Sequence, residues 1–274
     1  MIGYAGILEG LRGGAALIPE SAETVLLHAE LIEAQRSAVV RLGNIPDVIL
    51  KAAARLESGF PALSPESFQA DPGALARLSK RICEITARHR SDLAGPLHEI
   101  DAWLAQERVS MCALAAGYLR EGRIAAGEAA GLDGTLLAFS FNHTVHPFLR
   151  EYAGALAPLP AEAAWQRPFC PICAGEPDFA SLARGTGSRR LLCSRCDTEW
   201  AFGRVGCPFC GCDDPARVKY SLTEVPACRI GSCDRCGRYL KTIDLREADG
   251  ERLLPVERIL TVHLDLAARE AGYT

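Results

Sequence analysis

The sequence predicts an α+β protein with an N-terminal all-helical domain, two small metal-binding units and a C-terminal helix. Two observations support this fold class. Ten of the twelve cysteines follow residue 165, and apolar residues before that point recur at helical spacing without strand patterns. We therefore expect a helical domain with a terminal linker over residues 1–164. The first four-cysteine unit is expected over 165–206, and the second unit with the C-terminal helix over 207–274.

The N-terminal half is expected to form six or seven helices in an antiparallel bundle. Apolar side chains follow a helical period, and helix starts are marked by Asp71-Pro72 and by Asp133. The stretch from Ala155 to Ala164 contains Pro158 and Pro160, and we interpret it as the linker. The members of the two clearest apolar stripes are Val25, Leu26, Ala29, Ile32 and Leu75, Leu78, Ile82, Ile85.

Four Cys-x-x-Cys pairs dominate the C-terminal half. A Cys-x-x-Cys turn presents two sulfurs to one ion, and two such turns complete the tetrahedron that Zn²⁺ or iron takes with sulfur. The spacing therefore predicts two four-thiolate sites and two metal ions per chain, and the ligand type leaves iron and zinc both open. The pairs are Cys170/Cys173, Cys193/Cys196, Cys207/Cys210 and Cys233/Cys236.

The cysteine pairs form an internal repeat. Cys170 and Cys207 begin two units 37 residues apart, and Cys193 and Cys233 begin the closing pairs 40 residues apart. The repeat favours pairing of each pair with the next along the chain, while a cross-braced arrangement stays an alternative. Thiol–disulfide exchange is a weaker interpretation, because redox Cys-x-x-Cys motifs normally occur singly. Cys212 and Cys228 remain outside the pattern and are expected to be packed or free thiols.

Each unit is expected to be a rubredoxin-like or zinc-ribbon fold, a small ribbon of strands clamped by one ion. Glycines 175, 211 and 237 near the second cysteine of a pair suit a turn with positive φ. Strands are predicted over 189–192, 198–202 and 239–245, and a C-terminal helix over 256–272. Units this small bury little apolar surface, so the ion should supply much of their folding free energy.

Other residues with potential chemistry have simpler interpretations. His143 and His146 are three residues apart, but their surroundings are apolar and we expect partly buried histidines beside Pro147. Cys83 and Cys112 lie on apolar helix faces and are expected to be small core residues.

The bulk properties exclude some functional classes. The net charge of −4 argues against general binding to nucleic acid or to anionic membranes. The N-terminus lacks a basic signal-peptide region, and no apolar run is long enough for a membrane span, so membrane insertion is not expected. Twelve cysteines without an export signal indicate a reducing compartment, and we predict a cytoplasmic protein.

The cysteine half resembles the FdhE family, the accessory proteins of formate dehydrogenase assembly. The resemblance covers about a hundred residues. The matching segments are Cys170-Pro-Ile-Cys173, Arg190-Leu-Leu-Cys193-Ser-Arg-Cys196, Thr198-Glu199-Trp200, Arg204, Cys207-Pro-Phe-Cys210, Cys233-Asp-Arg-Cys236-Gly-Arg-Tyr239-Leu240-Lys241 and Leu264-Asp265-Leu266. The resemblance implies a cytoplasmic, non-enzymatic protein that binds rubredoxin-like metal, usually iron. It also implies contact with the catalytic subunit of a respiratory formate dehydrogenase during maturation.

Four residues between the two units are candidates for that contact: Thr198, Glu199, Trp200 and Arg204. Aromatic and arginine side chains dominate interface hot spots. The alternative is that Trp200 packs between the ribbons. The oligomeric state stays open, with a homodimer as one option.

Two other functions stay open at this stage. A nucleic-acid-binding zinc ribbon is kept open by a basic-aromatic cluster, although the overall charge argues against it. Electron transfer by rubredoxin-like iron is the other of these two functions. The cluster consists of Arg184, Arg189, Arg190 and Arg195 near Trp200 and Phe202.

Overall fold

The computed structural model describes residues 3–15, 21–43, 45–106, 109–159 and 165–274. The chain forms two compact units, which are described separately. One comprises Met1–Val25, Pro160–Pro171 and Glu176–Thr274, and the other comprises Leu26–Leu159 and Ile172–Gly175. Residues 172–175 group with the helical unit, where the Leu63 N–H donates a hydrogen bond to the Ile172 carbonyl at 2.9 Å.

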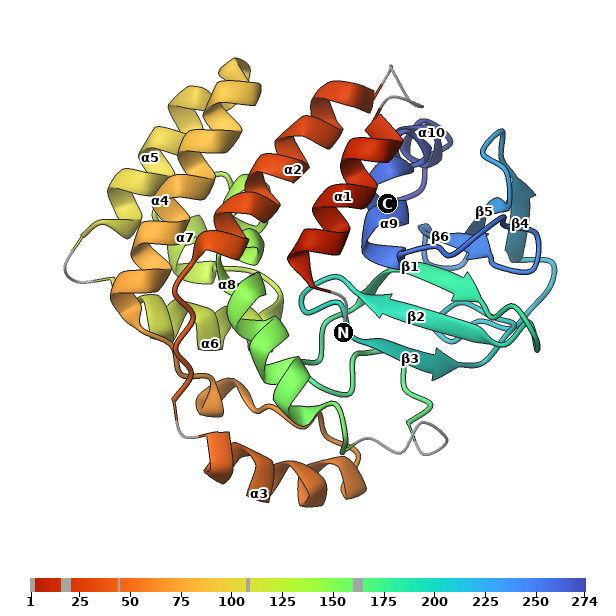
Figure 1. Ribbon diagram of the computed structural model, residues 1–274, viewed down its shortest axis with the longest axis horizontal. Coiled ribbons are helices and arrows are strands. Elements are labelled where there is room, and N and C mark those ends of the chain that lie inside the picture. The colour runs from red at the N-terminus through yellow and green to blue at the C-terminus, as the bar shows by residue number, and fades with distance from the viewer. Residues whose placement is uncertain (1–2, 16–20, 44, 107–108, 160–164) are drawn as a thin grey trace. The chain divides into compact units, whose positions relative to one another are not determined.

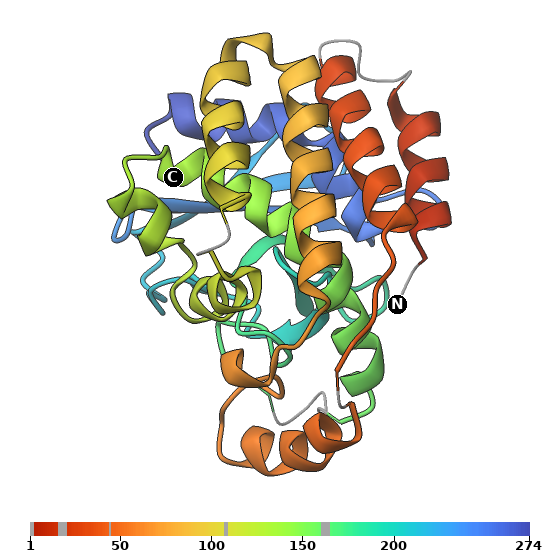
Figure 2. The same cartoon turned by 90° about the vertical axis from the view of Figure 1, so that its left-hand side faces the viewer.

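The second of these units is helical. Its described helices, with two short 3-10 turns, are α2 (Ala22–Ser37, whose first turn belongs to the other unit), α3 (Ile45–Glu57), η2 (Pro65–Ser67), α4 (Pro72–His89), η3 (Ser91–Leu93), α5 (Ala94–Leu104), α6 (Met111–Glu121), α7 (Ala125–Ala129) and α8 (Gly134–Leu156). Figure 2 shows α4 and α5 side by side. The predicted starts are confirmed, because the carboxylates of Asp71 and Asp133 cap α4 and α8.

Helix α8 is the centre of this unit. It contacts α3, α4, α5 and α7, and its Phe141, Val145, Phe148 and Tyr152 are fully buried. The Tyr152 hydroxyl accepts a hydrogen bond from the Gln69 N–H at 3.1 Å, so this large buried ring keeps its polar group satisfied. Helix α8 also extends into the stretch interpreted as a linker, and residues 160–164 of that stretch lie outside the described residues.

The other unit is built on one six-stranded sheet, with strand order β3-β2-β1-β6-β5-β4 (Figure 1). Its strands are β1 (Pro177–Leu182), β2 (Arg189–Cys193), β3 (Glu199–Phe202), β4 (Val218–Leu222), β5 (Cys228–Cys233) and β6 (Arg238–Asp244). The order of pairs and strands repeats: a cysteine pair, two strands, a second pair and a third strand. The predicted fold class and the internal repeat are therefore both present.

The two halves of the repeat share this sheet, so the three-stranded ribbon of each predicted unit is joined to the other, which the sequence did not indicate. Strand β1 pairs with β6 in parallel, with Phe179 opposite Lys241, while all other neighbours are antiparallel. Most side chains of both strands are buried, so β1 and β6 form the middle of a common core. Backbone pairing and burial make one sheet more favourable than two isolated ribbons.

The predicted C-terminal helical segment is present and is divided into two helices. Helix α9 (Leu254–Leu260) ends at Thr261, and α10 (Val262–Glu270) follows it. The buried Lys241 ammonium donates to the carbonyls of Arg258 and Thr261 at 3.0 and 3.2 Å, and to Asp265 at 2.7 Å. Lys241 therefore binds carbonyls that a continuous helix would use itself.

Helix α1 (Tyr4–Ala15) belongs to the sheet unit, where it packs against α9. A Cβ atom at Gly10 would lie 2.9 Å from Val256, and one at Gly14 would clash with Leu260. The compact units thus do not coincide with the predicted domains. The predicted domain boundaries stay a prediction, because a compact unit need not fold independently.

Candidate metal centres

The first four-cysteine cluster consists of Cys170, Cys173, Cys193 and Cys196. The first pair lies in the loop before β1, and the second pair begins at the last residue of β2. All four Sγ atoms lie within 4.8 Å of one another, and those of Cys170 and Cys196 are 3.6 Å apart. All four side chains are buried, so this cluster is closed to solvent.

The second cluster consists of Cys207, Cys210, Cys233 and Cys236, again within 4.8 Å of one another. The sulfurs of Cys207 and Cys236 are 3.7 Å apart, as are those of Cys210 and Cys233. Cys210 and Cys236 are partly exposed. The clusters join each pair to the next along the chain, so the structure has the sequential arrangement and not the cross-braced one.

The sulfur geometry fits a tetrahedrally coordinated ion. A metal–sulfur bond of about 2.3 Å in a tetrahedron places the sulfurs about 3.8 Å apart, close to the observed separations of 3.6 and 3.7 Å. The donor set is purely thiolate, which favours zinc or iron over calcium or magnesium. None of the twelve cysteines, all of which the structure describes, forms a disulfide, so no disulfide competes for these sulfurs.

Backbone and hydroxyl groups surround the sulfurs. At the first cluster the Arg195 N–H donates to Cys193 Sγ at 3.3 Å, and the Thr198 hydroxyl lies 3.1 Å from Cys196 Sγ. Such donors stabilise a thiolate and orient it toward an ion.

At the second cluster, burial and backbone donors shift the thiol pKa values in opposite directions. Burial raises the pKa of Cys207 to about 12, against the N–H groups of Cys210 and Phe209, which lower it. Burial also acts to raise the pKa of Cys233, but N–H donors including those of Cys236 and Arg235 bring it to about 7. One thiol of this cluster is therefore readily ionised near neutral pH, while another needs an ion to lose its proton.

Comparisons with known proteins agree with the resemblance seen in the sequence. No family model matches the chain. The FdhE homolog of Aquifex aeolicus is 24% identical over 261 residues, which are 93% of this chain and 87% of that protein. The FdhE protein of Escherichia coli O9:H4 is 35% identical over 117 residues, 41% of this chain and 37% of that one. The crystal structure of the Pseudomonas aeruginosa FdhE protein has the same fold, with a TM-score of 0.64 at 21% identity over 99% of this chain and 92% of that chain.

The chain is similar to FdhE proteins along most of its length, and these likenesses together support the FdhE family. Its predicted family membership is thereby confirmed, and the α+β architecture is that of the solved FdhE structure.

The candidate partner residues of this FdhE chain have different environments. Trp200 is 3% exposed and its indole N–H donates to the Arg167 carbonyl at 3.0 Å, so the indole is packed inside the protein. Glu199 is partly buried, and its carboxylate lies 3.6 Å from Arg190. Arg204 is exposed and Thr198 faces the first cluster. A partner-binding role of these residues stays a prediction, and it now depends on Glu199 and Arg204.

The basic-aromatic cluster does not form one exposed surface. Arg189 is buried, Arg190 faces Glu199, and Arg184 donates to the carbonyls of Ala248 and Gly250. These contacts weaken the case for phosphate recognition, which requires accessible guanidinium groups.

The remaining candidates have ordinary structural roles. The Gln35 Nε2 amide donates to His143 Nδ1 at 3.2 Å, and the His143 ring packs against Phe139. Among the described residues, neither His143 nor His146 joins a metal cluster. Cys83 and Cys228 are buried, and burial raises the pKa of each to about 11. Cys112 donates to the Ala70 carbonyl at 3.4 Å. Cys212 is buried beside the second cluster, but only its backbone carbonyl makes a hydrogen bond there, to the Cys207 N–H.

Sequence reasoning did not identify the charged residues that surround the clusters. Arg258 donates to Asp197 at 2.9 Å and to the Cys193 carbonyl at 3.4 Å, and so connects α9 to the first cluster. Arg238 lies 3.7 Å above the Phe209 ring at the second cluster. The sequence spacing of Arg258, Asp197 and Arg238 matches no recognised ligand motif. The proximity of Asp197 and Arg238 to cysteine pairs in the sequence was the one available signal.

Proposed function

We propose that this chain is a non-enzymatic accessory factor that binds the catalytic subunit of a formate dehydrogenase during its maturation in the cytoplasm. The observation that carries the proposal is a pair of tetrathiolate clusters on one sheet in a chain of the FdhE family. No described helix is both long and apolar enough to cross a bilayer.

The coordination chemistry supports a structural role for the ions. Cys170, Cys173, Cys193 and Cys196 would hold one ion, and Cys207, Cys210, Cys233 and Cys236 would hold the other. A bound ion would supply a cross-link between segments, and iron would add one-electron chemistry. Four thiolates complete a tetrahedron and leave no open position for a substrate, as in structural zinc sites. Such a closed site can hold a binding surface rigid, but it has no position at which a substrate could react.

Electron transfer by bound iron is the second candidate, and one observation favours it. Cys210 and Cys236 of the second cluster are partly exposed, whereas the first cluster is buried. Partly exposed thiolate ligands would shorten the distance over which an electron passes between the bound iron and a redox partner. A protein loaded only with zinc that still supports formate dehydrogenase activity in cells would exclude this candidate.

Capture of the purified catalytic subunit by the full-length chain tests the proposal. The parent protein should retain the subunit, and the double variant Glu199→Ala/Arg204→Ala should retain less while keeping its fold and metal content. A matched control is Arg269→Ala/Glu270→Ala, which removes the same two charges from exposed positions of α10. The control should bind like the parent, and formate dehydrogenase activity in cells should fall only in the first variant.

Two outcomes would contradict different parts of the proposal. No capture by the parent protein would refute binding of the catalytic subunit. Normal capture and activity with Glu199→Ala/Arg204→Ala would show that this segment is structural and that the contact lies elsewhere.

A further inference from the structure

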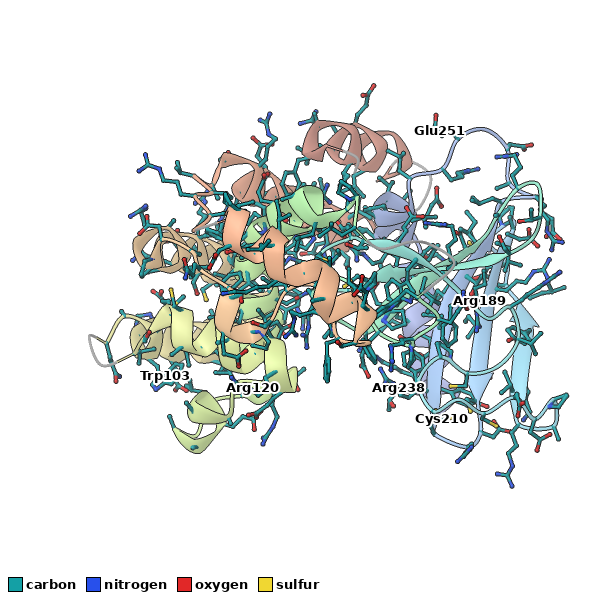
Figure 3. The ribbon with its side chains drawn as sticks, turned by 90° about the horizontal axis from the view of Figure 1, so that it is seen from below. Trp103, Arg120, Arg189, Cys210, Arg238 and Glu251 are labelled. Atoms are coloured by element: carbon teal, nitrogen blue, oxygen red, sulfur yellow. The ribbon has the colours of Figure 1, made fainter. Side chains whose placement is uncertain are left out.

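A buried arginine beside the second cluster has part of its guanidinium unsatisfied. Arg189, the first residue of β2, is 4% exposed. Its Nη1 donates to the Gly206 carbonyl at 3.0 Å, and the guanidinium carbon lies 5.2 Å from the centre of the Phe202 ring. Its Nε and Nη2 are buried and have no hydrogen-bond partner in the described part of the chain. Figure 3 labels Arg189 with Arg238 and Cys210, all three on the sheet unit.

The charge of Arg189 is not balanced by a carboxylate. Within the described residues Arg189 forms no ion pair, whereas its neighbour Arg190 faces Glu199 and Arg238 makes a two-pronged bond to Glu176 at 2.8 and 2.9 Å. Burial lowers the pKa of Arg189, and the groups that act to raise it are Tyr220 and the thiol of Cys207.

A buried cation without an anion is strongly unfavourable, because no partner replaces the lost hydration. The second cluster can supply the missing charge. Four thiolates and one divalent ion carry a net charge of −2, from four negative and two positive charges. Two cysteines of that cluster, Cys207 and Cys233, line the same small cavity as Arg189.

An external anion does not fit as the alternative. The cavity bounded by Arg189, Cys207, Tyr220 and Arg238 has a volume of about 20 Å³. This volume holds about one water molecule. A larger anion such as phosphate would therefore be excluded, and the protein's own thiolates are the available source of negative charge.

We propose that Arg189 is the internal counter-charge of the second tetrathiolate centre and selectively strengthens its hold on a divalent ion. The first centre has a different arrangement, because its nearby Arg258 is already balanced by Asp178 and Asp197. The inference rests on metal binding by the second centre, which is part of the proposed function, and is independent of any client protein.

Zinc competition with a chromophoric chelator, on the full-length reduced chain, tests this role. Arg189→Gln keeps N–H donors and removes the charge, so it should lower the affinity of the second centre by about 10- to 100-fold, as loss of an outer-shell partner typically does. The first centre should be unaffected. Arg189→Lys should restore most of the affinity, and the matched control Arg190→Gln should bind both ions like the parent. The two zinc ions of the parent should be released to the chelator in two steps. The step that is absent in the Cys236→Ser variant is assigned to the second centre.

Several results would overturn the proposal. It fails if Arg189→Gln binds both ions like the parent, if both centres weaken equally, or if Arg189→Lys is as weak as Arg189→Gln. Should Arg189→Gln not fold, Arg189→Lys decides alone, since tenfold weaker binding in that variant contradicts a role for the charge. A parent protein that binds only one zinc ion would overturn this inference, while capture of the catalytic subunit would still be measured separately.

Discussion

Each Cys-x-x-Cys turn is followed by a residue with positive φ: 61° at Ala174, 54° at Asp197, 68° at Gly211 and 70° at Gly237. Glycine adopts this conformation freely, but other residues lose roughly 1–2 kcal/mol in it. The second cluster therefore has two relaxed turns and the first has two strained ones. At Asp197 the carboxylate offsets part of this cost through its bond to Arg258.

Exchanging these residue types should shift stability in opposite directions. Gly211→Ala should destabilise the metal-loaded protein by about 1 kcal/mol, because a Cβ there meets no atom within 4 Å and the cost is confined to the backbone. Ala174→Gly should stabilise it by up to about 1 kcal/mol, reduced by the greater freedom of glycine in the unfolded chain. Urea unfolding of both variants measures these changes. Equal effects of the same sign would contradict this interpretation of the turns.

Zinc affinity of the second centre should rise with pH. In the metal-free protein the raised pKa of Cys207, about 12, keeps this thiol protonated at neutral pH, and zinc must displace its proton. Cys233 has a pKa of about 7, so below neutral pH zinc must displace a second proton from this thiol. Affinity should therefore increase from pH 6 to 8 and continue to increase above 8. Competition titrations at several pH values measure the trend, and an affinity independent of pH would contradict it.

At the scale of elements, local pattern predicted part of the sheet. Strands β2, β3 and β6 lie where β-rich segments flank cysteine pairs, as expected. Strand β1 was missed because it is buried on both faces and does not alternate, and β5 because Gly231 interrupts it. The parallel pairing of β1 with β6 joins segments about 60 residues apart, which no local pattern specifies.

The same distinction applies to the candidate site. The cysteine clusters could be predicted because each ligand pair is local in sequence. The burial of Arg189 and Trp200 could not, because it depends on which face of β2 and β3 the assembled sheet covers.

The contact between α1 and α9 depends on small residues. Gly14 is buried against Leu260, whereas the adjacent Gly13 is exposed with no atom within 4 Å of a Cβ position. Gly14→Val should cost about 1–3 kcal/mol through overpacking. The matched control Gly13→Val should be neutral or slightly stabilising, because valine is a better helix former than glycine. Denaturant unfolding separates the two, and equal stabilities would argue against close packing of α1.

At the scale of the whole molecule, the two compact units differ in what stabilises them. The helical unit has the apolar core around α8, while the sheet unit contains the second tetrathiolate cluster, three cysteines of the first cluster, and helices α1, α9 and α10. Metal should therefore contribute mainly to the sheet unit, as expected for small metal-binding folds.

Chelation under reducing conditions should accordingly unfold one unit before the other. Backbone amides of β1 to β6 should lose protection from hydrogen exchange, while those of α4, α5 and α8 keep it and most helical circular dichroism remains. Hydrogen exchange with mass spectrometry resolves the two regions. Simultaneous loss of protection in both would show a single cooperative unit and would contradict the predicted domain boundaries.

The metal content of protein purified without oxygen tests the central claim most directly. We expect two ions per chain, with thiolate-to-iron charge-transfer absorption if iron is bound and no colour if zinc is bound. Cys170→Ser and Cys236→Ser should each retain one ion, and the matched control Cys212→Ser should retain two, because Cys212 is buried but lies outside both clusters. A fully reduced parent protein with one ion or none, or unchanged metal content in Cys170→Ser and Cys236→Ser, would contradict the assignment of two tetrathiolate centres.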